Sequence, residues 1–253
     1  MTLRGVYTLF YKEVLRFGKV LLQTLLAPII TALLYLLVFG QALEGRVDVF
    51  PGISYTMFLV PGLIMMSVIQ NSFANSSSSL IQSKITGNLV FILLTPLSHL
   101  EFFVAFVAAA VLRGLLVGVG IYLVTLPFVD LPLAHPWLLL AFAAVGAAMP
   151  AVLGVIAGVW AHKFDQLAGF QNFIIMPLSF LAGVFYSIQG LPDFWRGLSH
   201  FNPFFYAIDG FRYGFFGVGD VSPLLSFAVM SGFLLLLSAI TLTMLKTGYR
   251  LRD

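Results

Sequence analysis

Residues 20–40 have the sequence VLLQTLLAPIITALLYLLVFG, which contains no charged side chain. A helix of about 20 apolar residues crosses the hydrocarbon core of a bilayer, so this stretch has the length and composition of a membrane span. Every backbone polar group needs an internal hydrogen bond in hydrocarbon, which favours a helix. Further apolar stretches of similar length lie at 55–76, 100–126, 137–161, 167–187 and 224–245. The sequence therefore predicts an all-α membrane protein with six transmembrane helices.

The composition agrees with this class and excludes several others. Charged residues make up 9% of the 253 residues, and the mean hydropathy is +1.02, whereas charged residues are about a quarter of a soluble chain. The chain has no cysteine, which rules out disulfides, thiolate metal sites and cysteine nucleophiles. The first apolar stretch is too long for a cleavable signal, so we expect it to remain as a span. The net charge of +3 fits a membrane bias and is no argument for nucleic-acid binding.

The basic residues predict the orientation of the chain. With a cytoplasmic N-terminus, the inner side holds Arg4, Lys12, Arg16, Lys19, Lys84, Lys163, Lys246, Arg250 and Arg252. The outer side then holds only Arg46, Arg196 and Arg212, together with the acidic residues Glu44, Asp48, Asp130, Asp193, Asp209 and Asp220. Because Lys and Arg accumulate in cytoplasmic loops, both termini are predicted to be cytoplasmic.

Residues 3–17 have the pattern of an amphipathic helix. One predicted face carries Leu3, Val6, Tyr7, Phe10, Val14 and Phe17, and another carries Arg4, Thr8, Lys12 and Arg16. Such a helix lies in the plane of the membrane surface, here on the cytoplasmic side. A soluble extension of the first span is the alternative.

The second cytoplasmic segment, 77–99, contains the apolar run LVFILL at 89–94. This run is too short to span a bilayer and calls for a partner surface. We expect a short helix, ended by Pro96, that docks on another protein or on the membrane surface. The alternative is burial against its own bundle. Ser98 and Glu101 form a capping-box sequence that is expected to start the third span.

The outer segment at about 188–222 is rich in aromatic residues and is interrupted by Pro192, Asn202-Pro203 and several glycines. This pattern indicates two short helices that dip back from the outer interface, which requires surrounding protein or a wet cavity. An aromatic belt on an interfacial helix is the alternative.

Arg113 is the basic residue deep inside a predicted span, where an unpaired charge is costly. Asn71 and Asn75 on the second span are its candidate partners. Two interpretations remain open at this point: structural pairing, and contact with an anionic group of a substrate.

Several kinds of chemistry are absent from the sequence. The string Gly217-Val218-Gly219-Asp220 matches an intramembrane aspartyl protease motif, but Asp220 falls at the outer end of a span, away from a second aspartate. The four histidines are scattered near interfaces, which suggests no metal cluster. There is no phosphate-binding loop, so energy from ATP would have to come from a partner. We predict no catalytic, cofactor-binding or metal-ligating residue in this chain.

Taken together, the sequence resembles the membrane subunits of ABC-2-type transporters, in particular the YadH-type bacterial inner-membrane permeases. The resemblance covers essentially the whole chain, 1–253, as one transmembrane domain. The residues that carry it form the segments Val60–Ile69, Arg113–Leu115, Gly183–Ser187, Phe194–Trp195, Gly197–His200, Asn202–Pro203 and Gly210–Phe215.

The resemblance implies a homodimeric inner-membrane permease that works with two copies of a separate ATPase subunit, which would bind the ATP and Mg²⁺. It implies export of a hydrophobic or amphipathic substrate, such as a drug, a lipid or a lipid-linked glycan. It also implies a cytoplasmic connecting helix near 3–17, a coupling helix at 83–95 and re-entrant outer helices at 188–216. The candidate ATPase-coupling residues are Lys84, Asn88, Val90, Phe91 and Leu94. The candidate substrate-pathway residues are Asn71, Asn75, Arg113, Phe185 and Tyr186.

The chain departs from this family in one place. Relatives often carry charged residues just before the leucines of the coupling helix, where this chain has Leu89-Val90-Phe91-Ile92.

An ion-coupled transporter, or a membrane scaffold of an envelope complex, is the alternative function. The absence of Asp or Glu from the centre of every predicted span favours the ABC permease over ion coupling.

Overall fold

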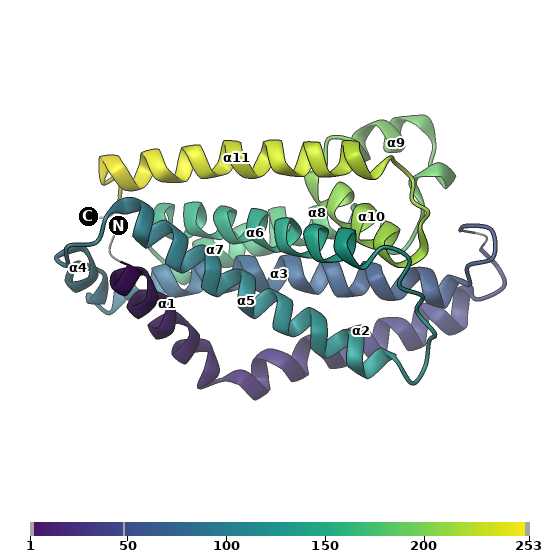
Figure 1. The fold of residues 1–253 in the computed structure, drawn as a ribbon, viewed down its shortest axis with the longest axis horizontal. Helices are drawn as coiled ribbons and strands as arrows, with labels where there is room; N and C mark the ends of the chain where they lie inside the picture. Colours follow the sequence, from purple (N-terminus) through teal and green to yellow (C-terminus); the bar gives the residue numbers. More distant parts are fainter. Residues whose placement is uncertain (1–2, 48, 251–253) are drawn as a thin grey trace.

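The computed structural model describes residues 3–47 and 49–250, and its regular structure there is helical. Asp48 and Arg252, both used above to predict orientation, lie outside the described residues. Five helices are long and apolar enough to cross a membrane, and they run side by side along the molecule (Figure 1). They are α2 (Leu21–Leu43), α3 (Tyr55–Ile85), α5 (His99–Thr125), α6 (Pro136–Trp160) and α11 (Pro223–Thr247).

Local signals mark the starts of several of these helices. Ser98 and Glu101 form the expected capping box at the start of α5. Pro136 and Pro223 occupy the first turns of α6 and α11, where a missing N–H removes no helical hydrogen bond.

Helix α3 is the centre of the bundle, and α5 and α6 pack closely on it through glycines. A Cβ at Gly114 would lie 2.0 Å from Ser72 Oγ, and a Cβ at Gly154 would lie 2.2 Å from Ser76 Oγ. Only hydrogen at these positions allows the backbones to approach so closely. Within its most hydropathic window α3 is 72% buried, against 17% for α2 and α11. Helices α2 and α11 therefore lie on the outside of the bundle and leave apolar surface for lipid or a partner.

The fifth predicted span, 167–187, is not one uninterrupted helix of that length. Its place is taken by α7 (Phe164–Phe170), a π-helical turn (Gln171–Ile175) and α8 (Met176–Phe180). Helical structure stops at Phe180, and Gly183 adopts a φ of +75°, which favours glycine. Pro177, in the first turn of α8, cannot donate to the helical ladder.

The two ends of the bundle carry different elements (Figure 1). One end holds the start of α1 (Leu3–Gly18), the short helix α4 (Asn88–Leu93) and the end of α11. The opposite end holds α9 (Asp193–Ser199) and α10 (Pro203–Phe216), reached through a 3-10 turn at Ile188–Gly190.

Two predictions change in this region, the bounds of the coupling helix and the buried face of α1. Residues 83–85 of the predicted coupling helix belong to the last turn of α3, so the separate helix is only Asn88–Leu93. In α1 the stripe buried against the rest of the chain runs through Leu9, Glu13 and Phe17, whereas Tyr7 is 64% exposed.

Candidate functional site

A polar stripe follows one face of α3. Between Phe58 and Ser83 every residue of α3 is buried except six, of which all but one are polar. These six are Ser67, Gln70, Asn71, Ala74, Ser78 and Gln82. Gln70 and Asn71 are adjacent and the other steps are three or four residues, which puts all six on one side of the helix. A lipid-facing stripe would be apolar, so this face is suited to water, a polar partner or a substrate.

Arg113 lies beside this stripe, and its predicted contacts with α3 are present. Its Nη1 donates to Asn75 Oδ1 at 3.4 Å and its Nη2 donates to Asn71 Oδ1 at 3.5 Å. Both distances are long for N–H···O bonds. The Nε atom of Arg113 is buried and has no hydrogen-bond partner.

Glu13 is the acidic residue of this region that the sequence analysis missed. Its side chain is fully buried and forms ion pairs with Lys12 Nζ at 2.8 Å and Arg16 Nε at 3.1 Å. Ser79 Oγ donates to Glu13 Oε2 at 2.5 Å. Arg16 Nη2 donates to both the Oδ1 and the backbone oxygen of Asn75, at 2.8 and 2.9 Å. These bonds attach α1 to the C-terminal half of α3.

Phe185 lies apart from Arg16 and Arg113, within a group of aromatic rings. Its ring centroid is 5.6 Å from Tyr35, 4.9 Å from Phe39 and 5.6 Å from Phe180. Tyr55 Oη donates to the backbone oxygen of Phe185 at 3.0 Å. The rings close the space between α2 and the turn that follows α8.

Tyr35 connects the two groups of predicted pathway residues. Its ring packs edge-on against Phe180 and Phe185. It also lines a cavity of about 200 Å³ between α2 and α3 that includes Ser67, Gln70 and Asn71. The polar stripe and the aromatic cluster are therefore neighbours along α2.

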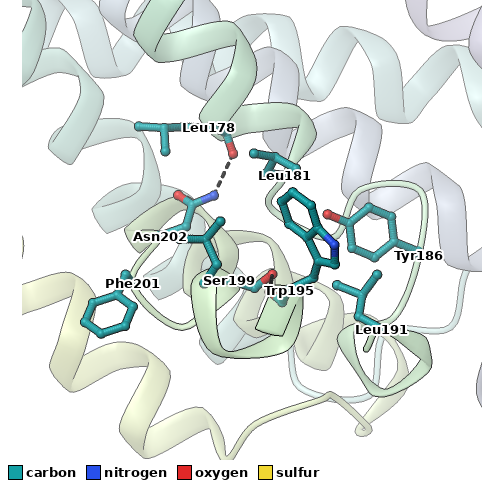
Figure 2. Close-up of a pocket in the computed structure, with 9 residues that line it drawn as sticks. Leu178, Leu181, Tyr186, Leu191, Trp195, Ser199, Phe201 and Asn202 are labelled. Atoms are coloured by element: carbon teal, nitrogen blue, oxygen red, sulfur yellow. Dashed lines mark hydrogen bonds between the residues drawn. The ribbon is translucent and has the colours of Figure 1, made fainter. Parts of the chain in front are cut away.

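Tyr186 faces a second, larger pocket (Figure 2). This pocket has a volume of about 430 Å³ and is lined mainly by apolar and aromatic side chains of α8, α9 and the turn between them. Trp195 lies next to Tyr186, and Asn202 Nδ2 donates to the backbone oxygen of Leu178 at 2.7 Å. Aromatic side chains at the end of a bundle are typical membrane-interface anchors.

The predicted coupling segment presents an apolar face. Val90, Phe91 and Leu94 are 55%, 71% and 77% exposed. Leu89 is buried and belongs to the cluster that includes Phe102 of α5. Leu89 therefore anchors α4 to the bundle, which leaves the opposite side of α4 available.

The other two predicted coupling residues make contacts within the chain. Lys84 Nζ donates to the backbone oxygens of Val159 and Ala161, the latter at 3.2 Å, and so stabilises the C-terminal end of α6. Asn88 Nδ2 donates to Thr86 Oγ1 at 3.0 Å. The structure thus separates the exposed apolar residues of this segment from Lys84, which holds α3 to α6.

Arg212 lies in α10, at the end of the bundle opposite α4. It was predicted on the outer side of the membrane, and its side chain is completely buried. Its guanidinium stacks on the Phe58 ring at 3.7 Å and donates to the backbone oxygens of Phe58 and Gly183 at 3.3 and 2.9 Å. Asp209 accepts from the backbone nitrogens of Asp220 and Val221 at 2.7 and 3.1 Å. These polar residues fix α10 to its neighbours.

Comparison with known proteins identifies the class of protein that this fold and these sites define. The family model of the ABC-2 type transporter matches residues 4–216, and the chain belongs to this family of membrane-embedded transport permeases. It is 39% identical to the inner membrane transport permease YadH of Escherichia coli K12, over 97% of this chain and 96% of that protein.

Nodulation protein J is a more distant relative. The protein from Sinorhizobium fredii NGR234 is 30% identical, over 76% of this chain and 75% of its own length. The protein from Rhizobium leguminosarum bv. viciae is 28% identical, over 79% and 78%. The chain is accordingly a transport permease of the inner membrane, and its family implies an ABC ATPase partner.

Proposed function

We propose that this chain is the membrane-spanning subunit of an ATP-binding cassette exporter. Two copies form the permease, and two copies of a separate ATPase bind ATP and Mg²⁺. The complex moves a hydrophobic or amphipathic substrate, such as a drug, a lipid or a lipid-linked glycan, across the inner membrane.

The observation that carries the proposal is the exposed apolar face of α4. Phe91 and Leu94 are more than two-thirds exposed, on a helix too short to enter a bilayer and anchored by Leu89. An apolar face of this kind is stable in water only when a partner covers it. The ATPase implied by the family is the expected partner, with Val90, Phe91 and Leu94 in its groove.

The arrangement of the ends supports six spans with both termini on the same side of the membrane, which the basic residues predict to be the cytoplasm. The start of α1 and the end of α11 lie at the same end of the bundle (Figure 1), which requires an even number of crossings. The five long helices supply an odd number. The α7 to α8 segment, at 164–180, runs between the end of α6 and the opposite end, and so acts as the sixth crossing. Helices α9 and α10 would then be the re-entrant outer elements.

Within this scheme the polar stripe of α3 lines the substrate pathway. Asn71, Asn75 and Arg113 lie in its inner and central part, and Phe185 and Tyr186 belong to its outer end. The stripe suits the polar part of an amphipathic substrate, and the aromatic cluster suits the apolar part.

The proposal is tested by purifying the tagged chain from membranes in mild detergent. We expect an ABC ATPase to copurify in equal amounts and to hydrolyse ATP in the complex. Reconstituted into vesicles, the pair should depend on ATP for substrate movement. A chain that is purified intact and functional without any ATPase would support an ion-coupled transporter or a scaffold instead.

A further inference from the structure

The arginine cluster at α1, α3 and α5 has more positive charge than its carboxylate can balance. Asn75 Oδ1, a neutral oxygen, accepts from Arg16 Nη2 at 2.8 Å and from Arg113 Nη1 at 3.4 Å. Two guanidinium groups therefore meet at one amide. Like charges this close repel each other, most strongly where water is scarce.

No carboxylate of the described chain pairs with Arg113. Both oxygens of Glu13 are already occupied by Lys12, Arg16 and Ser79. Helices α2, α3, α6 and α11 contain no Asp or Glu. Glu101 is on α5 itself, twelve residues before Arg113, or about 18 Å along the helix at 1.5 Å per residue.

A polar cavity lies next to this cluster. The space of about 200 Å³ between α2 and α3 is lined by Thr31, Ser67, Gln70 and Asn71, besides apolar residues. Asn71 also accepts from Arg113, so the guanidinium lies directly behind the cavity wall. The Nε2 atom of Gln70 is buried and has no partner. A water takes about 30 Å³ in the liquid, so the cavity has room for an anionic group with bound water.

We propose that this cavity binds the anionic headgroup of an amphipathic substrate, a phosphate or a carboxylate, with Gln70 and Asn71 of its lining as ligands and the positive charge of Arg113 behind Asn71. The inference rests on the proposed function and names the substrate class of the same pathway. The anion balances the charge of the second arginine and offers an acceptor to Gln70 Nε2, which has no partner within the chain. A hydrogen bond to an ionised group is stronger than one between neutral groups.

The surroundings favour an amphiphile over a free anion. The remaining lining of the cavity is apolar and includes Leu63, Met66 and Ala32. Tyr35 leads from the cavity to the rings of Phe39 and Phe185. A headgroup at Asn71 can therefore keep an alkyl chain against apolar and aromatic surface.

The test is direct binding to the purified chain in dodecyl maltoside, which requires no ATPase. Radiolabelled dodecyl phosphate is the probe, and the uncharged detergent supplies the same tail in excess. Competitors are unlabelled dodecyl phosphate, inorganic phosphate and dodecyltrimethylammonium. We expect saturable binding that unlabelled dodecyl phosphate displaces and that neither of the other two displaces at matched concentration.

Variants localise the binding. Arg113→Gln should weaken dodecyl phosphate binding tenfold or more, because the positive charge behind the cavity wall is lost. Gln70→Leu, which keeps the volume of the side chain and the net charge of the protein, should weaken it severalfold. Lys19→Gln removes the same charge from an exposed position next to α2 and should leave the affinity unchanged. Gln70→Leu keeps the test valid if Arg113→Gln proves unstable.

Three results would overturn the inference. The first is binding that Lys19→Gln lowers as much as Arg113→Gln does, which would indicate attraction to overall charge. The second is unchanged affinity in Gln70→Leu and in a folded Arg113→Gln. The third is equal competition by inorganic phosphate, which would indicate a site for free anions. Because copurification of an ATPase is measured separately, a failure here leaves the proposed permease function standing.

Discussion

Replacement of Phe91 by alanine is the most direct test of the division of labour between this chain and an ATPase. A phenylalanine side chain has on the order of 180 Å² of surface, and Phe91 is 71% exposed. About 130 Å² is thus free for a partner, which corresponds to about 3 kcal/mol at 25 cal/mol per Å². Alanine keeps part of this area and grooves fit imperfectly, so we expect a loss of about 2 kcal/mol, or roughly 30-fold in affinity.

The assay measures binding of the copurifying ATPase to the immobilised permease in detergent, followed by ATP hydrolysis in reconstituted vesicles. Phe91→Asp should be worse than Phe91→Ala, because it also places an unpaired charge in the interface. Phe128→Ala is the matched control: Phe128 is 69% exposed and lies between α5 and α6 at the opposite end of the bundle. It should bind the ATPase like the parent chain.

The thermal stability of the permease alone separates interface from fold. Because Phe91 makes few contacts within the chain, both of its variants should melt close to the parent. The reasoning is refuted if Phe91→Ala and Phe91→Asp bind the ATPase normally and support full hydrolysis. In that case α4 is not the docking helix, and its apolar face must be covered by lipid or by a second permease.

Three further predictions concern topology and packing. In intact cells, cysteines introduced as Asp130→Cys or Asp193→Cys should react with an impermeant thiol reagent and Lys163→Cys should not, and the chain has no native cysteine to interfere. Labelling of Lys163→Cys would reverse the orientation. Gly154→Ala should destabilise the permease by about 1–3 kcal/mol, because its Cβ would lie 2.2 Å from Ser76 Oγ and 2.5 Å from Phe73 O. The control Gly169→Ala, whose Cβ would have nothing within 4 Å, should melt like the parent. Arg212→Lys should lower the melting temperature in detergent, because an ammonium cannot stack on Phe58 while bonding two backbone oxygens. Arg46→Lys, at an exposed position, is the control, and equal melting of the two variants would contradict the packing role of Arg212.

The parts of the fold that sequence predicts well are those set by local chemistry. The start of α5 follows from Ser98 and Glu101 alone, since a capping box satisfies donors within one turn. The contact of Arg113 with Asn71 and Asn75 was predictable for a different reason. A charge inside a span needs a polar partner, and the neighbouring span offers few.

Other features depend on tertiary contacts that no local pattern carries. Glu13 stands between Lys12 and Arg16 and has the sequence pattern of an exposed, neutralised charge, yet Ser79 of α3 buries it. Arg212 belongs to a segment whose sequence predicts an outer position, and only its position between Phe58 and Gly183 makes it a core residue. Hydropathy likewise continues past Phe180, although the helix ends there, because hydropathy does not detect backbone conformation.

The continuity of α3 gives a physical account of how the two ends of the permease could be coupled. Its last two turns are held to α6 by Lys84 and to α1 through Ser79, and α4 follows within three residues. At its first turn Tyr55 bonds to the backbone of Phe185 in the aromatic cluster. Helix α3 has 31 residues, contains Pro61 and is about 46 Å long. If α3 moves as one body, a displacement of α4 by an ATPase would reach the Phe185 turn through this helix, and the polar stripe, which lies between these two ends, would move with it. Coupling of this kind would need no separate chain of side-chain contacts between the ATPase surface and the aromatic cluster.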